Sequence, residues 1–317
     1  MTLVRHQTTQ LPRLVGLAAV LGIVAVALTT SPVLAAKGTH GGGGGGSSVP
    51  TGNDVSYPQC GGSLPTSPAF GIVGVNGGLA NDLNPCLGIS SSYPSYSQSE
   101  LYWAVASSVG SATQPRASLY VNTADPGNVY KGNLIADWPK SGSSVTYGAC
   151  TTITAGGSTM GQNSPACAYQ YGYNKAAQDA QWLTSAADSI NQQPAPSSVS
   201  ASPATYPWWL DVETGNTWQS GTSGQAMNVA DLQGMIAALQ AAGVTAIGAY
   251  STTSQWDQIT GGTTSTSGSL YGLSDWIPGA KTLSAAEANC TLASFTSGAV
   301  ELTQWAGRSI DSDYACP

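Results

Sequence analysis

Short apolar runs that alternate with helical patterns are the feature that most constrains the fold of this 317-residue chain. Runs of four to eight apolar residues bounded by Gly, Asn or Asp are typical of buried strands, and apolar residues spaced by three or four are typical of helices. Strands separated by helices pair in parallel. A domain over residues 58–317 with this alternation has the size of a (β/α) barrel, typically about 250 residues. The predicted strands cover residues 70–78, 117–122, 168–173, 206–213, 244–250, 276–277 and 299–305, and the predicted helices 99–109, 174–190, 229–242 and 254–259.

The first 35 residues have the layout of a secretory signal. Arg5 and Arg13 precede an uncharged apolar run over residues 14–28, and small residues follow at 33–35. The run is shorter than the roughly 20 residues of a membrane span. We therefore expect a cleaved signal over residues 1–35, a secreted protein and no membrane contact after cleavage. An uncleaved anchor is the alternative.

Residues 36–57 are predicted to be a disordered linker because they include six consecutive glycines at 41–46. The folded domain is then expected over residues 58–317.

Six cysteines, all inside the expected domain, agree with export. An even number in a secreted chain indicates disulfides, and six cysteines allow 15 pairings. Pairing each cysteine with its nearest neighbour closes the shortest loops, which predicts Cys60–Cys86, Cys150–Cys167 and Cys290–Cys316.

Charge and histidine content exclude several kinds of site. Nine Lys and Arg against sixteen Asp and Glu give a net charge of −7, which argues against nucleic-acid binding. Both histidines, His6 and His40, precede the expected domain, so the domain can hold neither a Ser-His dyad nor a His-ligated zinc. No metal, nucleotide or flavin motif is visible, and we expect no cofactor. Acid–base chemistry must then depend mainly on carboxylates.

The sequence Asp211-Val212-Glu213 is the sharpest candidate for such chemistry. Alternate residues of a strand point to the same side, and the carboxyl ends of barrel strands form the active face. A Glu beside a second carboxylate and apolar residues has a raised pKa, as a general acid requires. Trp218 and Tyr250 could stack against a sugar. The alternative is that Asp211 caps the next loop and Glu213 is solvated.

The order of several segments between Phe70 and Cys316 resembles the family 25 glycoside hydrolases, the lysozyme-like muramidases. The segments are FGIVGVNGG, YGYNKAAQDAQWL, WWLDVET, AIGAYSTTSQW, DWIPGA and VELTQWAGRSIDSDYAC. The resemblance implies a partly irregular TIM-like barrel with Glu213 as general acid/base. Asp211 would position the substrate acetamide or stabilise a positive intermediate, and Asp311 or Asp313 would be a late carboxylate. Asn76 and Trp305 complete the expected substrate-binding set.

Two positions depart from that family. Its first strand ends in an Asp, whereas the predicted first strand here offers Val73, Val75 and Asn76, with no acid before Asp82. Tyr171 and Tyr173 stand where the family has an aromatic and histidine cluster.

The sequence therefore predicts a secreted, monomeric glycoside hydrolase-like protein that acts on a cell-wall polysaccharide of the peptidoglycan type. One alternative is a catalytically inactive carbohydrate- or wall-binding domain on the same barrel. The other is a structural surface or spore-type protein, in line with the low charge content of 8%.

Overall fold

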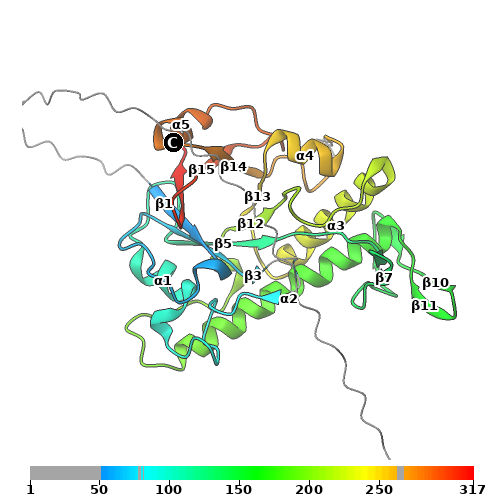
Figure 1. Ribbon diagram of the computed structural model, residues 1–317, viewed down its shortest axis with the longest axis horizontal. Helices are drawn as coiled ribbons and strands as arrows, with labels where there is room; N and C mark the ends of the chain where they lie inside the picture. The colour runs from blue at the N-terminus through cyan, green and yellow to red at the C-terminus, as the bar shows by residue number, and fades with distance from the viewer. Residues whose placement is uncertain (1–50, 78–79, 81, 263–267) are drawn as a thin grey trace, which may run out of the picture. The chain divides into compact units, whose positions relative to one another are not determined.

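Eight strands close into a barrel in the computed structural model, which describes residues 51–77, 80, 82–262 and 268–317 (Figure 1). The order around the barrel is β1-β16-β15-β14-β13-β12-β5-β2. The expected signal and the linker up to residue 50 lie outside the described residues. The barrel strands are β1 (Thr51–Val55), β2 (Gly71–Gly74), β5 (Ala117–Asn122), β12 (Trp208–Asp211), β13 (Ile247–Tyr250), β14 (Ser274–Ala280), β15 (Val300–Trp305) and β16 (Asp311–Ala315).

Helices follow most of the parallel strands, as the alternation predicts. None of the helices in the described ranges combines the length and apolar character needed to cross a bilayer. The helices are α1 (Glu100–Ser107), α2 (Pro165–Asn191), α3 (Gly221–Ala241), α4 (Thr253–Thr260) and α5 (Leu283–Asn289), with short 3₁₀ turns at Tyr57–Gln59, Tyr96–Gln98 and Pro203–Thr205.

The barrel is irregular at its closure. Strand β16 runs antiparallel to both β15 and β1, whereas the other neighbouring strands are parallel. Register shifts interrupt the pairing of β14 with β15. These features confirm the expectation of a partly irregular TIM-like barrel.

Strand β1 begins inside the segment that the sequence assigns to the linker, so the expected boundary at residue 57 is too late. Thr51–Val55 contains Gly, Asn and Asp, which are rare in strands, and its own composition gives no strand signal. The strand forms because it pairs with β16 on one side and β2 on the other. Asn53 adds a side-chain hydrogen bond of 3.0 Å to the carbonyl of Asp311.

The predicted strand at 168–173 is wrong, because these residues belong to the first turns of α2. The helix begins at Pro165, and the hydroxyl of Ser164 accepts a hydrogen bond from the Cys167 amide. Gly172 on α2 lies against α3, where a Cβ atom would stand 2.0 Å from the carbonyl oxygen of Asp231. Close helix packing therefore overrides the β-propensity of the tyrosines.

An insertion between β5 and α2 carries three small hairpins that the sequence did not predict. Figure 1 shows the β10–β11 hairpin beyond the region where α2 and α3 pack. The disulfide Cys150–Cys167 joins the insertion to α2. The short strands are β6 (Val129–Tyr130), β7 (Asn133–Leu134), β8 (Ser143–Ser144), β9 (Gly148–Ala149), β10 (Thr152–Ala155) and β11 (Ser158–Gly161); a further pair, β3 (Asn76–Gly77) and β4 (Asp82–Leu83), follows β2.

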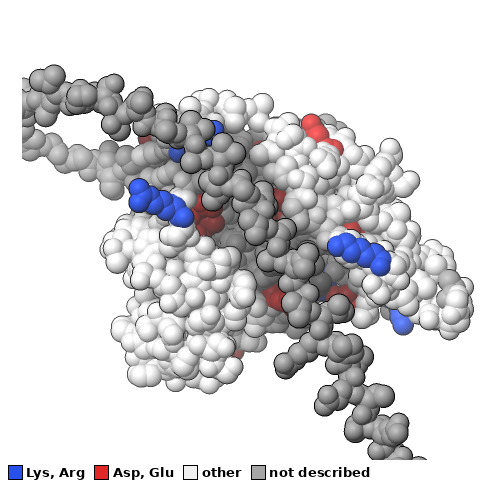
Figure 2. Space-filling model, viewed as in Figure 1, with Lys and Arg blue, Asp and Glu red and all other residues white. Residues whose placement is uncertain are grey.

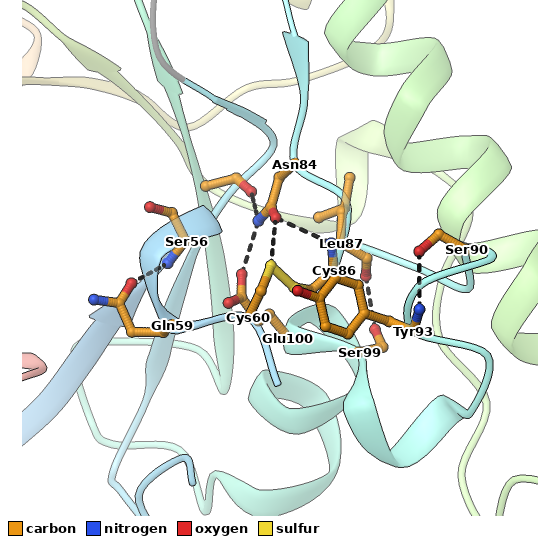
Figure 3. Close-up of a disulfide and its surroundings, with 11 residues drawn as sticks. Ser56, Gln59, Cys60, Asn84, Cys86, Leu87, Ser90, Tyr93, Ser99 and Glu100 are labelled. Atoms are coloured by element: carbon orange, nitrogen blue, oxygen red, sulfur yellow. Dashed lines mark hydrogen bonds between the residues drawn. A yellow bond between two sulfur atoms is a disulfide. The ribbon is translucent and has the colours of Figure 1, made fainter. Parts of the chain in front are cut away.

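All three nearest-neighbour disulfides are present, which confirms the predicted pairing. Cys60–Cys86 connects the segment after β1 to the segment after β4 (Figure 3). Cys290–Cys316 joins the end of α5 to the chain just after β16.

Strand alternation divides the core into two layers. Along β12, Trp208 and Leu210 pack in the large cluster that includes the helices, whereas Trp209 packs inside the barrel with Ile72 and Trp276. The next inward position after Trp209 is Asp211, at the carboxyl end of the strand. The same period therefore places apolar side chains in the barrel interior and a carboxylate at its mouth.

Candidate active site

Aromatic rings form the apolar part of the barrel interior next to the mouth. The ring of Trp276 meets Trp209, Tyr250 and Tyr120 edge to face, with centroid separations of 5.9, 4.6 and 6.3 Å. Trp209 and Trp276 are almost fully buried. These contacts give the mouth a rigid aromatic base.

Above this base lies a cavity of about 220 Å³. Its side chains come from the carboxyl ends of the parallel strands and from the first residue of β16, which starts at the same end because it runs antiparallel. The cavity is lined by Asp54, Tyr120, Asn122, Asp211, Glu213, Tyr250, Trp276, Gln304 and Asp311.

Asp211 and Glu213 both line this cavity, although only Asp211 is within the strand. Glu213 lies two residues beyond the end of β12. The indole nitrogen of Trp218 holds this segment by donating a 2.8 Å hydrogen bond to the carbonyl of Glu213. The backbone amide of Thr214 donates to Oε1 of Gln255 on α4 at 2.6 Å. The side chains of Trp218 and Gln255 therefore hold the backbone at Glu213 in place.

The electrostatics of the two carboxyl groups favour protonation. Burial raises the pKa of Glu213, and a hydrogen bond with Gln255 partly opposes this effect. Burial raises the pKa of Asp211 more strongly, and the nearby carboxylates of Glu213 and Asp54 add to it. Oδ1 of Asp211 is buried and has no hydrogen-bond partner among the described residues. A buried carboxyl group that stays protonated near neutral pH can serve as a proton donor.

Asp54 is the acidic residue that the sequence analysis missed. It lies on β1, opposite Asp311 of β16, and lines the cavity. Nε2 of Gln304 donates a 2.9 Å hydrogen bond to its Oδ2 atom. Burial raises the pKa of Asp54 to about 6 and the charge of Asp311 adds to this effect, whereas hydrogen bonds with Gln304 and Asp313 lower it. The family resemblance implies an acidic residue on the first strand. This expectation leads to Asp54 only if the first strand is placed before Phe70, whereas the apolar pattern places it at Phe70.

The other predicted site residues are distributed between the cavity and its surroundings. Tyr250 and Asp311 line it. Asp313 is fully buried, and its Oδ1 accepts a 3.0 Å hydrogen bond from the Trp276 indole, so it lies one inward position deeper than Asp311. Asn76 is also buried, where its side chain exchanges hydrogen bonds with the backbone of Asn122.

Trp218 and Trp305 lie outside the cavity lining. Trp218 lines a neighbouring cavity of about 320 Å³, formed by the loop after Glu213, the start of α3 and the end of α4. Trp305 is half-buried on β15, where the inward position belongs to Gln304. The cavity residues absent from the sequence prediction are Asp54, Tyr120, Asn122, Trp276 and Gln304.

The described residues contain one group whose His, Cys, Asp or Glu ligand atoms lie close enough to share a metal ion, namely Cys60, Cys86 and Glu100. Because the two cysteines form a disulfide, this group offers no thiolate to a metal.

Charged side chains are sparse on the face of the molecule shown in Figure 2, and uncharged residues cover most of it. The cavity differs from that surface because four of its lining residues are acidic. It combines proton donors with a carboxyl group that can ionise near pH 6. These are the groups needed to protonate a leaving oxygen and to stabilise a positive charge nearby.

Comparison with known proteins gives one family similarity. The family model described as "Lysozyme-like protein 1" matches residues 200–273. That segment contains β12, α3, β13 and α4, together with Asp211 and Glu213. The comparison with curated proteins finds no match.

Two solved structures are similar to the chain at low identity. One is the bacterial lysozyme from Streptomyces coelicolor, at 13% identity and a TM-score of 0.39, covering 85% of this chain and 93% of that chain. The other is a muramidase from Trichobolus zukalii, at 14% identity and a TM-score of 0.37, covering 84% and 93% of the two chains.

Proposed function

We propose that the protein is an exported glycoside hydrolase that cleaves a cell-wall glycan of the peptidoglycan type. The observation that carries this proposal is the convergence of Asp54, Asp211 and Glu213 on one cavity at the carboxyl ends of the barrel strands. The similarity of residues 200–273 to a lysozyme-like family supports the choice of substrate.

Glu213 is the proton donor in this proposal. Its pKa is raised by burial, so a larger fraction of the side chain carries a proton near neutral pH. It is also less enclosed than Asp211, which is 7% exposed, and so it can approach a bound glycan. Glu213 would protonate the glycosidic oxygen as the bond to the sugar breaks, and its carboxylate would then take a proton from the water that adds to the anomeric carbon.

Asp54 and Asp211 act on the sugar side of that bond. Charge develops at the anomeric carbon in glycoside hydrolysis, and a carboxylate nearby stabilises it. Asp54 has the lower pKa of the two because Gln304 donates to it, so it is the ionised member. Asp211, which stays protonated, would position the substrate acetamide through a hydrogen bond.

The aromatic base supplies an apolar contact for the sugar ring. Tyr250 and Trp276 line the cavity with their rings 4.6 Å apart in an edge-to-face arrangement. Rings held in this way offer a pre-organised surface with a small entropic cost on binding.

We also propose that the protein is exported and acts as a monomer. The three disulfides suit an oxidising compartment. The expected signal over residues 1–35 would direct the chain there, and the insoluble wall polymer would be its partner.

The test is incubation of the oxidised protein with insoluble peptidoglycan, with the bound fraction and the release of reducing ends measured together. We expect binding and a steady release of reducing ends, and mass spectrometry of the products identifies which sugar carries the new end. Binding without release would show a carbohydrate-binding domain instead of an enzyme. Neither binding nor release would favour a structural surface protein and contradict the proposal.

A further inference from the structure

Gln304 joins two residues of the cavity that lie on different strands. Its Oε1 atom is 2.9 Å from the hydroxyl of Tyr250 on β13, and its Nε2 atom is 2.9 Å from Oδ2 of Asp54 on β1. The side chain is 8% exposed and lies on β15, in the inward position. The oxygen and the nitrogen of one side-chain amide therefore each make a hydrogen bond inside the barrel mouth.

The surroundings of Asp54 are acidic from several sides. Asp311 faces it from β16 and Asp211 from β12, and the phenols of Tyr120 and Tyr250 face it from β5 and β13. Burial raises the pKa of Asp313 on β16, and the hydrogen bond between Asp313 and Asp54 lowers the pKa of Asp54, as the hydrogen bond from Gln304 does. The ion pair found in the described ranges joins Lys175 to Asp137, away from this cluster, so no described cation pairs with Asp54. A neutral amide thus takes the place that a Lys or Arg would occupy in an ion pair.

Tyr250 determines which end of the amide faces Asp54. Burial raises the pKa of Tyr250, and the carboxylates around it add to that effect, so its hydroxyl keeps its proton and donates to Oε1 of Gln304. Nε2 must then point to Asp54. In the reversed orientation the amide oxygen would face a carboxylate oxygen, and two acceptors would meet without a proton between them.

We propose that Gln304 is a positioning residue that orients the Asp54 carboxylate and favours its ionised form, with Tyr250 fixing the direction of the amide. The inference rests on the proposed function for its catalytic meaning. A fixed and ionised Asp54 places negative charge next to the sugar before positive charge develops there, which is how preorganised groups accelerate a reaction.

The experiment compares the titration of Asp54 in four folded proteins: the wild type, Gln304→Met, Tyr250→Phe and the control Gln240→Met. Methionine keeps the length of glutamine and removes the donor. Gln240 is an exposed residue of α3 outside the cavity. Carbon-13 NMR of the side-chain carboxyl groups follows Asp54, with Asp54→Asn used for its assignment, and the pH profile of kcat/KM on peptidoglycan is recorded in parallel.

We expect Gln304→Met to raise the pKa of Asp54 by about one unit, a tenfold change in proton affinity. The acidic limb of the kcat/KM profile should move by the same amount. Tyr250→Phe should shift both in the same direction by less, because the donor remains but its orientation is no longer fixed. Gln240→Met should leave both unchanged.

An unchanged Asp54 titration in Gln304→Met and Tyr250→Phe would overturn the inference. If Gln304→Met fails to fold, Tyr250→Phe still decides the question. A wild type that releases no reducing ends while Asp54 titrates as expected would contradict the proposed function and support the positioning role. If the wild type releases reducing ends but the pH profile of kcat/KM is unshifted in both variants, the result would support the proposed function and contradict the positioning role of Gln304.

Discussion

The side-chain amide of Asn84 donates a 2.7 Å hydrogen bond to Oε2 of Glu100 in the protein interior, beside the Cys60–Cys86 disulfide (Figure 3). Glu100 is 1% exposed, and its Oε1 atom has no hydrogen-bond partner among the described residues. Burial raises the pKa of Glu100 to about 7, and the Asn84 hydrogen bond only partly opposes this effect.

Glu100 should therefore make the free energy of unfolding depend on pH. The folded state binds a proton at Glu100 more tightly than the unfolded state, whose pKa is near 4.5. The contribution is fully present below pH 4.5 and is lost as the pH rises through 7. The pKa difference corresponds to about 3 kcal/mol. Urea unfolding of the wild type and Glu100→Gln between pH 4 and 8 measures it.

In Glu100→Gln, this part of the pH dependence should disappear, and the two proteins should differ in slope between pH 4.5 and 7. Glu287→Gln, at an exposed position of α5, is the matched control and should follow the wild type. Parallel slopes for the wild type and Glu100→Gln would show that Glu100 does not titrate as described.

The contact between α2 and α3 should be intolerant of a single methyl group at Gly172. A Cβ atom there would stand 2.0 Å from the carbonyl oxygen of Asp231, which is backbone and cannot move aside easily. We expect Gly172→Ala to lower the free energy of unfolding by at least about 1–3 kcal/mol, the usual cost of overpacking. Gly215→Ala, where the methyl group would meet no atom within 4 Å, is the control for urea unfolding. Equal stability of the two variants would contradict the close packing.

Removal of the Cys150–Cys167 disulfide should destabilise the insertion after β5. The two cysteines are 17 residues apart, and a loop of this length gives about 3 kcal/mol of stabilisation in the chain-entropy treatment. We expect the double variant Cys150→Ser/Cys167→Ser to lose stability of that order in thermal unfolding. An unchanged melting temperature, with both remaining disulfides intact by thiol titration, would show that other contacts hold the insertion.

Much of the fold follows from local sequence patterns because most barrel strands are apolar and bounded by turn residues. Strand β5 has the bounds that its pattern predicts, residues 117–122. Strand β1 could not be predicted this way, since Gly, Asn and Asp form a strand there only through pairing with β16 and β2. Residues 168–173 form a helix because tight packing on α3 outweighs their β-propensity.

The candidate site likewise contains residues that local sequence patterns predict and residues that only the tertiary structure reveals. Asp211, Glu213 and Tyr250 stand at the carboxyl ends of predicted strands with clear apolar patterns, and all three line the cavity. Asp54 was missed together with its strand. Trp305 belongs to the predicted site, whereas the inward face of β15 is set by Leu302, which packs inside the barrel. Period-two alternation from Leu302 selects Gln304, but the inward register is known only from the structure.

The most direct test of the central claim is the rate of reducing-end release from peptidoglycan by Glu213→Gln, measured beside the wild type and Glu287→Gln. Glutamine keeps the size and hydrogen-bonding capacity of Glu213 but has no acidic proton to transfer to the leaving oxygen. Because general acid catalysis contributes about 10²- to 10⁴-fold, we expect the Glu213→Gln rate to fall by at least about 10²-fold, with binding and folding preserved. Glu287→Gln should match the wild type. A Glu213→Gln rate equal to that of the wild type would contradict the account.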